Sequence, residues 1–191
     1  DVSICQDREE LNAAVGSLLS AEREVIVQEY VGHCEEEYTV GVLHDLNGGF
    51  IHSIALRREI RHGLGCKIKV VNRTGRNELG DSLVISSGIS VGEIGDYPAV
   101  RKACVEIAEA LGSLGPLNIQ CRKTGNTIIP FEINPRFSGT TSSRALVGFN
   151  EPGILIRKHL LGEDPRKCID HEYGYVAREY AEVIVGKQSD A

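Results

Sequence analysis

The segment FEINPRFSG, residues 131–139, carries three different polar groups at alternating positions. In an extended chain, side chains at i, i+2 and i+4 lie on one face of the strand. Glu132, Asn134 and Arg136 would therefore present a carboxylate, an amide and a guanidinium in the same direction. Such a set is suited to holding a hard cation and an anion together.

Residues 116–135 predict a β-hairpin, because two strand-like runs flank a short glycine-containing turn. Asn118 and Gln120 share one face of its first strand. If the register sets them beside Glu132 and Asn134, four oxygen-bearing side chains form one patch, and Mg²⁺ favours such ligands. A polar strand face in solvent shows the same alternation, so spacing alone leaves that alternative open.

Two other stretches are candidate nucleotide contacts. The run QEYVGHCEEEYTV has a short polar break between strand-like segments, where free backbone groups could read an adenine edge and Glu37 could hold a ribose hydroxyl. A solvated turn is the alternative reading. A basic cluster could neutralise a triphosphate or form a charged strand edge, and it comprises Arg57, Arg58, Arg61, His62 and Lys67.

Bulk properties exclude several classes of protein. The 191 residues can bury one medium core, and a net charge of −6 argues against a nucleic-acid module. No apolar run approaches the ~20 residues that a membrane span needs. The six cysteines show no CxxC pair and no short Cys/His spacing, which predicts reduced thiols in a cytoplasmic protein and argues against zinc. A homo-oligomer is left open.

Hydrophobic periodicity then predicts the elements that position these residues. Helices are expected over 7–20, 97–115, 140–149 and 151–163. Strands are expected over 1–6, 24–31, 36–45, 49–60, 66–73, 116–123, 126–135 and 173–185. The stretch 74–96 is expected to be loop with one short strand, and DLNGG predicts an antiparallel hairpin between the strands on either side of it.

Taken together, these stretches resemble the later part of an ATP-grasp domain, most closely that of the carbamoyl phosphate synthase large subunit and its short-form relatives. The resemblance is carried by residues 118–163, with residues 28–40 upstream. It implies an α+β ATP-grasp fold: a mainly antiparallel sheet flanked by helices, with a truncated small lid subdomain at the N-terminus. It also implies three parts, a lid remnant (1–28), a large subdomain with the metal and nucleotide site (29–186) and a tail (187–191).

The resemblance further assigns roles around the hairpin. Gln120 and Glu132 would hold one divalent cation, Mg²⁺ or Mn²⁺, and Glu132 and Asn134 would hold a second one between the ATP phosphates. Asn118 would support the site. Arg136 would contact the γ-phosphate or the carboxylate that accepts it.

It also assigns the nucleotide contacts. The backbone of Glu29, Tyr30 and Val31 would read adenine, Glu37 would hold the ribose, and His62 would lie near the phosphates. The sequence departs from the family pattern in two ways. A lysine and a flexible glycine-rich loop are not found, and Gly139 stands where the synthases carry a basic residue. The first departure predicts a fragment whose partner is the missing N-terminal part of the same protein, and the second leaves bicarbonate specificity open.

The favoured hypothesis is therefore an ATP- and Mg-dependent ligase of the carboxylate-amine type, which activates a small carboxylate as an acyl phosphate. The alternative is a nucleotide-binding module without turnover. A carbamoyl phosphate synthase proper is a third reading, and it would need a longer parent protein. For the isolated chain we expect weak ATPase activity or none, because half of the phosphate clamp is missing.

Overall fold

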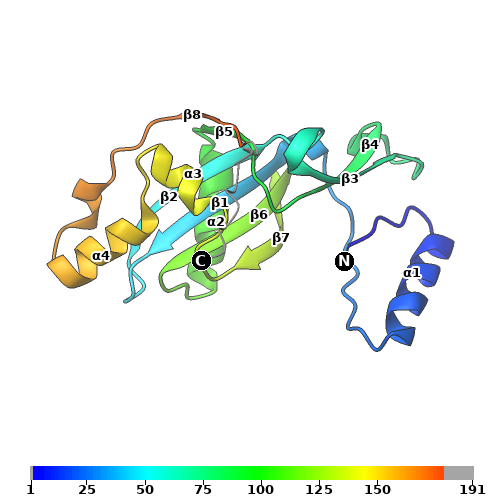
Figure 1. Cartoon of the computed structure of the whole chain (residues 1–191), viewed down its shortest axis with the longest axis horizontal. Coiled ribbons are helices and arrows are strands. Elements are labelled where there is room, and N and C mark those ends of the chain that lie inside the picture. The colour runs from blue at the N-terminus through cyan, green and yellow to red at the C-terminus, as the bar shows by residue number, and fades with distance from the viewer. Residues whose placement is uncertain (1, 179–191) are drawn as a thin grey trace, which may run out of the picture.

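The computed structural model describes residues 2–178, and its centre is a six-stranded antiparallel sheet of order β7-β6-β1-β2-β5-β8 (Figure 1). Its strands are β1 (Glu37–His44), β2 (Phe50–Arg58), β5 (Gly92–Gly95), β6 (Pro116–Thr124), β7 (Thr127–Asn134) and β8 (Gly174–Val176). A second, two-stranded sheet pairs β3 (Cys66–Val71) with β4 (Ser82–Ser86). The α-helices are α1 (Arg8–Ser20), α2 (Pro98–Ala110), α3 (Thr141–Leu146) and α4 (Glu151–Leu161). Short 3₁₀ turns cover Cys34–Glu36, Gly63–Gly65, Asn77–Leu79 and Pro165–Cys168.

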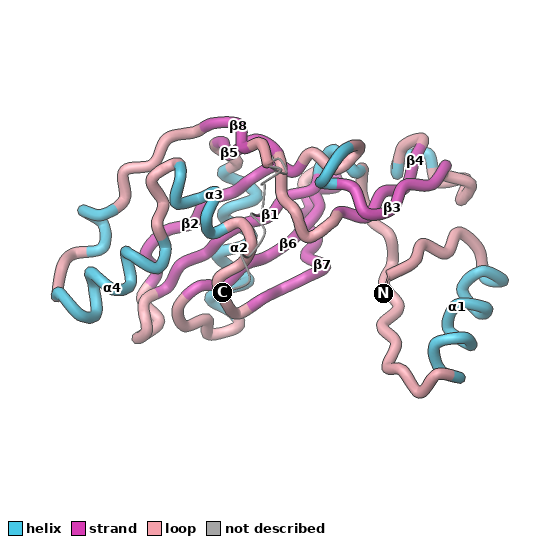
Figure 2. Tube along the Cα trace, in the orientation of Figure 1, coloured by secondary structure: helices cyan, strands magenta, loops and turns pink. Residues whose placement is uncertain are grey.

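Helices cover both faces of the large sheet, with α2 on one face and α3 and α4 on the other (Figure 2). Alternate residues of a strand point to opposite faces, and β1 therefore contributes to two environments. Tyr38, Val40 and Val42 join the core under α2, whereas Glu37 and Thr39 face the side of α3. All eight residues of β1 are buried because both of its faces are covered.

The two predicted hairpins of the large sheet are confirmed. β1 and β2 pair across the turn that begins at Asp45, whose Oδ1 accepts hydrogen bonds from the backbone N–H groups of Asn47 and Gly49. Lys158 of α4 also donates to Asp45, and this bond lowers the pKa of the Asp45 carboxyl to about 2. β6 and β7 pair around Gly125, whose positive φ of 57° suits the tight turn.

Some predicted strands are wrong. Residues 2–6 and 24–31 form no strand, although the second stretch is rich in β-branched residues. Strand preference expresses itself through packing against a neighbouring strand. This stretch lacks one, and Ile26 is 85% exposed. The stretch 74–96 holds two strands, β4 and β5, where one was expected. The closing strand is present as β8, and its predicted extension beyond 178 lies outside the described residues, as does the 187–191 tail.

Helix α1 lies apart from the large sheet (Figure 1). Asp7 caps it as predicted, since its side chain accepts a hydrogen bond from the Glu10 backbone N–H at 2.8 Å. No residue of α1 is fully buried. Arg73, which follows β3, donates to Glu10 at 2.7 Å, so polar contacts attach α1 to the β3–β4 hairpin. The assignment of residues 1–28 to a lid subdomain stays a prediction.

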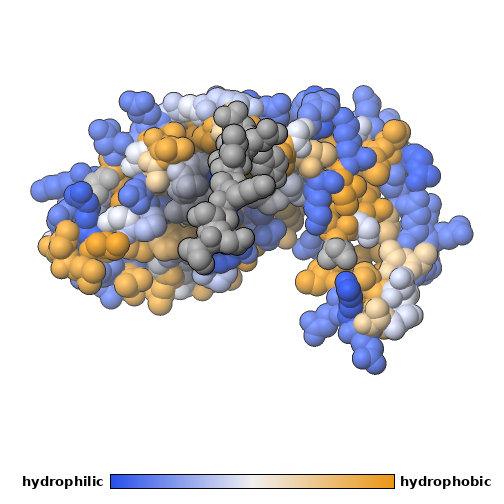
Figure 3. Space-filling model, in the orientation of Figure 1, coloured by the Kyte–Doolittle hydropathy of each residue, from blue (hydrophilic) through white to orange (hydrophobic). Residues whose placement is uncertain are grey.

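The described surface has both charged and apolar regions. Apolar side chains gather along α4, where Ile156, Leu160 and Leu161 are exposed (Figure 3). Within residues 2–178, no helix is both long and apolar enough to cross a membrane. Among the cysteines whose side chains the structure describes, Cys5, Cys34, Cys66, Cys104 and Cys121 are free thiols.

Candidate functional site

The register of the β6–β7 hairpin brings the four predicted oxygen-bearing side chains together. Gln120 pairs with Glu132, and Asn118 pairs with Asn134. A bulge follows directly after Gln120, so this register holds only for the part of the hairpin that carries the patch. The patch lies on the sheet face that α3 covers in part, and the chain leaves β7 immediately after it.

Glu132, Asn134 and Arg136 form a continuous polar chain at the end of β7. The Asn134 Nδ2 donates to Glu132 Oε1 at 2.7 Å, and its Oδ1 lies 3.4 Å from the donating Arg136 Nη2. Arg136 Nη1 also donates to the carbonyl of Phe137 at 2.9 Å. Glu132 and Arg136 are exposed. A ligand could therefore contact the carboxylate and the guanidinium at the same end of β7.

The buried side chain of Arg58 binds the Gln120 side chain. From the sequence, Arg58 was predicted only as part of a basic cluster. The Gln120 Oε1 accepts from Arg58 Nη1 at 2.7 Å. Arg58 is 4% exposed and also donates to Ser86, to the Ser87 carbonyl and to Glu37. Burial lowers the pKa of the Arg58 guanidinium, and the charges of Glu37 and Glu132 oppose that shift.

The buried position of Arg58 corrects its assignment to the basic cluster, whose other members, Arg57, Arg61, His62 and Lys67, are exposed. Arg57 and Arg58 are neighbours on β2 and must point to opposite faces. Arg57 pairs with Glu93 on the α2 side, whereas Arg58 lies under the β6–β7 patch. The signal was present in the sequence, because alternation places Arg58 on the same face as Ile54 and Leu56, which are buried.

Glu37 differs from its predicted position in an open ribose site. Its side chain is 1% exposed, and both carboxylate oxygens accept from arginines. Oε1 lies 3.2 Å from Arg58 Nη1, and Oε2 lies 2.8 Å from Arg122 Nη2 and 3.0 Å from Arg122 Nε. A carboxylate buried between two guanidiniums is held by these ion pairs and is not open to a ribose hydroxyl in this conformation.

The predicted adenine-reading segment lies beside the same hairpin. Gln28 Nε2 donates to the Phe131 carbonyl at 3.2 Å, next to Glu132 in the chain. Arg122 donates to the Val31 carbonyl at 3.2 Å and stacks over the Tyr30 ring at 4.4 Å. A second arginine, Arg76, binds the segment at Glu29 and Tyr30.

That second arginine is Arg76. It pairs with the Glu29 carboxylate at 3.0 Å and donates to the Tyr30 carbonyl at 3.3 Å. The segment is thus fixed next to the metal-ligand candidates, while its contact with adenine stays a prediction. Arg76 and Arg122 were not named from the sequence, since no spacing pattern links them to residues 29–31.

Asn118 is buried and supports the loop that follows β7. Its Oδ1 accepts from Arg144 Nη2 at 2.6 Å and from the hydroxyls of Thr39 and Ser138 at 3.0 Å each. The Thr140 hydroxyl lies 3.4 Å from the same oxygen but 2.6 Å from the Ser138 hydroxyl, with which it makes the closer hydrogen bond. Because these donors occupy the amide oxygen, Asn118 fits its predicted supporting role better than that of a direct ligand.

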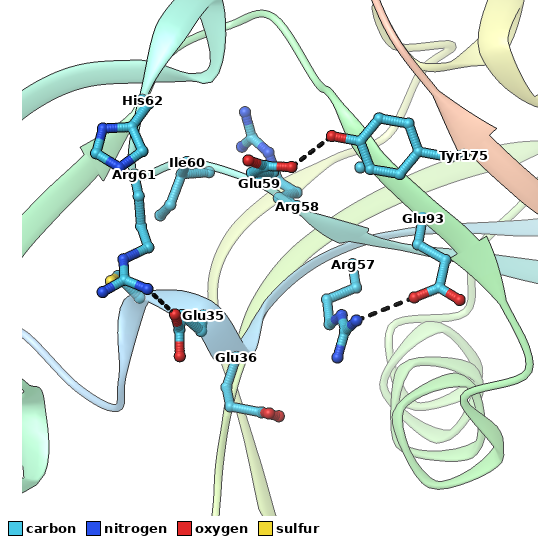
Figure 4. Close-up of a pocket in the computed structure, with 12 residues that line it drawn as sticks. Glu35, Glu36, Arg57, Arg58, Glu59, Ile60, Arg61, His62, Glu93 and Tyr175 are labelled. Atoms are coloured by element: carbon cyan, nitrogen blue, oxygen red, sulfur yellow. Dashed lines mark hydrogen bonds and ion pairs between the residues drawn. The ribbon is translucent and has the colours of Figure 1, made fainter.

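His62 lies in a different place from the patch. It lines a cleft of about 480 Å³ whose walls come from residues 34–36, 57–62 and 92–93 and from Tyr175 (Figure 4). Ion pairs line its rim, Arg61 with Glu35 and Arg57 with Glu93. Among the described residues, Arg58 lines this cleft and also contacts Gln120, but no residue of the β6–β7 patch lines the cleft itself. Its predicted place near the phosphates stays a prediction.

The patch offers a suitable donor set for a hard divalent cation. Glu132 has one oxygen without a hydrogen-bond partner among residues 2–178. The Gln120 and Asn134 oxygens each accept one hydrogen bond, from Arg58 and Arg136, and each would bind a cation with its second lone pair. A half-turn of the Asn134 amide would place its oxygen, in place of Nδ2, beside the carboxylate. No group of three or more His, Cys, Asp or Glu within the described residues is arranged to hold a metal, so any metal here would rely on amide oxygens.

The comparisons with known proteins identify the class. The chain belongs to the ATP-grasp proteins, because the family model described as "ATP-grasp in the biosynthetic pathway with Ter operon" matches residues 21–183. The expected ATP-grasp fold, an antiparallel sheet flanked by helices, is therefore confirmed. The match establishes the family but not the closer likeness to carbamoyl phosphate synthases. No match is found among curated proteins.

The solved structures that are similar to this chain include two of D-alanine–D-alanine ligase. One is D-alanine–D-alanine ligase from Bacillus anthracis complexed with ATP, with 14% identity, a TM-score of 0.46, and coverage of 82% of this chain and 49% of that chain. The other is a structure of D-alanine–D-alanine ligase from the same organism, with 17% identity, a TM-score of 0.46, and coverage of 82% and 48%. The chain thus spans about half the length of these proteins.

Proposed function

We propose that this chain binds ATP over the β6–β7 patch and forms part of an ATP-dependent ligase of the carboxylate-amine type. The observation that carries the proposal is the hairpin register, which sets Gln120 against Glu132 and Asn118 against Asn134, with Arg136 just beyond. A patch of one carboxylate and amide oxygens beside a guanidinium can hold a metal-bound polyphosphate. The family match supports the same reading.

We place Mg²⁺ or Mn²⁺ at this patch. Gln120 and Glu132 would hold one ion, and Glu132 and Asn134 would hold another. Bound there, the metal would neutralise phosphate charge. Arg136 lies two residues beyond Asn134 and would contact the γ-phosphate or the accepting carboxylate.

The proposed reaction activates a small carboxylate. A carboxylate oxygen attacks the γ-phosphorus, the bond from that phosphorus to the β,γ-bridging oxygen breaks, and ADP leaves with the electron pair. The resulting acyl phosphate is then captured by a nitrogen nucleophile, which displaces inorganic phosphate. The protein needs no covalent nucleophile for this sequence, because it acts by positioning and by charge stabilisation.

The finer assignments form part of the same proposal. We infer a carbamoyl phosphate synthase-like order of steps from the resemblance of residues 118–163. The segment 29–31 would hold the adenine, and His62 would reach the phosphates only after a rearrangement of the loop after β2. Residues 1–28 are proposed as part of a lid subdomain and residues 29–186 as the large subdomain.

Metal binding provides a direct test, with Mn²⁺ as the probe. Electron paramagnetic resonance measures free Mn²⁺ during a titration of the chain in the presence of a nonhydrolysable ATP analogue. We expect Glu132→Gln to weaken nucleotide-dependent Mn²⁺ binding by about tenfold or more, since one ligand charge is lost. Glu109→Gln, at an exposed position on α2, is the matched control and should leave Mn²⁺ binding unchanged. Equal Mn²⁺ affinity in the two variants would refute the metal site.

A further inference from the structure

An exposed apolar surface lies at the end of the large sheet where β1 turns into β2. Three neighbouring segments form it: the β1–β2 turn, the end of α2 with the connection that follows, and α4. We call it the end surface, and it comprises Leu46, Leu111, Leu114, Ile156, Leu160 and Leu161. Each of these residues is between 52% and 77% exposed. Apolar side chains gather along this edge of the molecule, at the lower left of the view (Figure 3).

Contacts among the three segments make the end surface continuous. A Cβ added to Gly48 would lie 3.4 Å from Cδ2 of Leu114, and one added to Gly115 would lie 3.7 Å from Cδ2 of Leu46. The β1–β2 turn therefore touches the connection after α2. On the other side of the turn, the backbone N–H of Leu46 donates to His159 Nε2 of α4 at 3.1 Å. Leu46 thus lies between the end of α2 and the end of α4.

The packing of α4 within the chain does not account for its exposed apolar residues. α4 contacts the core through Ile154, which is 2% exposed. Ile156 and Leu160 are four residues apart, so they share a face of the helix, and both are exposed. The outer face of a surface helix normally carries polar residues. A continuous apolar surface on a soluble protein instead marks a contact site.

The form of the end surface favours a protein partner over a small molecule. Small molecules bind in concave sites, whereas protein interfaces combine an apolar centre with a polar rim. None of the six residues lines the 480 Å³ cleft or the clefts of about 380 and 170 Å³ elsewhere in the described part of the chain. The net charge of −6 also disfavours a nucleic acid or an anionic membrane as the partner.

The rim of the end surface carries opposite charges on its two sides. Near the end of α2 lies the exposed carboxylate of Glu109. On the side of α4, the turn that lies against this helix contributes the exposed Arg166 and Lys167. The Glu163 carboxylate on that side is paired with Arg157 at 3.1 Å. A twofold axis sets the α2 side of one copy against the α4 side of the other, so the end surface is complementary to itself in charge.

We propose that the end surface is the contact between two copies of this chain related by a twofold axis. Leu111 and Leu114 of one copy would pack against Leu160 and Leu161 of the other, with Leu46 near the axis. Each acidic rim would then face a basic rim, and the apolar centre would be removed from water. This inference does not depend on the proposed function, because no residue of the β6–β7 patch belongs to the end surface.

Sedimentation velocity of the full chain over a wide range of concentrations tests the proposal. We expect a reversible monomer–dimer equilibrium. Leu160→Glu should weaken the dimer by about tenfold or more, because a carboxylate would be buried in the apolar centre. Leu146→Glu is the matched control, since Leu146 is 84% exposed on α3 outside the end surface, and it should dimerise as the unmodified chain does. Circular dichroism checks that both variants are folded.

Charge reversal tests the twofold arrangement itself. Glu109→Lys makes both sides of the rim basic and Arg166→Glu makes the basic side more acidic, so each variant alone should dimerise more weakly. An equal mixture of the two should form a heterodimer, because each reversed rim then meets a rim of opposite charge. A change in the stability of the single chain would not produce this rescue.

Three results would overturn the inference. The first is a monomer at every concentration of the unmodified chain, which would mean that a partner of another kind covers the end surface. The second is an equal effect of Leu146→Glu and Leu160→Glu on the dimer. The third is a mixture of the two charge variants that associates no better than either variant alone.

Discussion

At the residue scale, Glu37 links the two halves of the candidate site without facing a ligand. Its carboxylate holds Arg58, which holds the Gln120 amide, and it also holds Arg122, which holds the Val31 carbonyl. A metal-ligand candidate and the proposed adenine segment are thus positioned by one buried acid. Glu37 was predicted to bind the ribose, whereas in the structure it positions Arg58 and Arg122.

Glu37→Gln should be strongly destabilising. The amide keeps the shape of the side chain but leaves two buried guanidiniums without a counter-charge, a change that costs about 3–5 kcal/mol. Urea unfolding measures the loss. Glu93→Gln is the matched control, because Glu93 pairs with Arg57 where both side chains are about half exposed, and it should cost about 1 kcal/mol or less. Equal losses in the two variants would contradict the assigned burial.

At the element scale, the packing of α3 against β1 depends on one glycine. An added Cβ at Gly41 would lie 2.6 Å from Cζ of Arg144, which is 2% exposed and donates to Asn118 and Glu151. Because Gly41 has no side chain, β1 leaves room for the buried guanidinium of Arg144, which belongs to α3. Glycine in a strand often marks such a close approach.

Gly41→Ala should therefore destabilise the protein by about 2–4 kcal/mol, since the methyl displaces Arg144 from a buried ion pair. Thermal unfolding followed by circular dichroism measures the change. Gly16→Ala in α1 is the matched control, because apart from the backbone of the helix itself no atom lies within 4 Å of the added Cβ. It should be neutral or stabilise the helix by roughly 0.5–1 kcal/mol. A neutral Gly41→Ala would show that Arg144 can move without cost.

A histidine on β2 makes the contact with the C-terminal region sensitive to pH. His52 packs 5.4 Å from Phe149 and 4.9 Å from His171, measured between ring centroids. Burial, together with the charges of Arg101 and His171, lowers the pKa of His52 to about 4. The neutral ring is therefore favoured in the folded state. Its contribution to stability is complete above the unfolded pKa of about 6.5 and is lost as pH falls toward 4.

His52→Gln should flatten the fall in stability between about pH 6.5 and 4. Because His52 is only partly buried, the contribution removed is roughly 1–2 kcal/mol. Urea unfolding across this pH range measures it in both proteins. Parallel stability curves would exclude a part for His52.

Sequence reasoning succeeded where a pattern is local and failed where a partner is distant. The β6–β7 hairpin followed from alternation and a short turn, whereas its register was left open, and the structure sets Gln120 beside Glu132. The burial of Arg122 could not, because it depends on Glu37, which lies 85 residues earlier in the chain. The prediction for 24–31 failed for a similar reason, since its β-branched residues could not show that this stretch would form no backbone ladder with a strand, although Gln28 contacts β7.

At the scale of the whole molecule, the two sheet faces carry different features. The β6–β7 patch, the loop after β7 and Arg178 lie on the side of α3, whereas Arg57 and Glu93 lie on the side of α2. The cleft lined by His62 adjoins that second side (Figure 4). None of the metal-ligand candidates of the β6–β7 patch lines that cleft.

The central claim is that the β6–β7 patch binds a metal-bound nucleotide, and calorimetry tests it most directly. The chain is titrated with a nonhydrolysable ATP analogue, with and without Mg²⁺, alongside Glu132→Ala and the α2 control Glu109→Ala. We expect Mg²⁺-dependent binding by the unmodified chain and the control, and its loss in Glu132→Ala with the fold retained, because Glu132 is exposed. Binding that persists in Glu132→Ala, or that does not depend on Mg²⁺, would contradict the account.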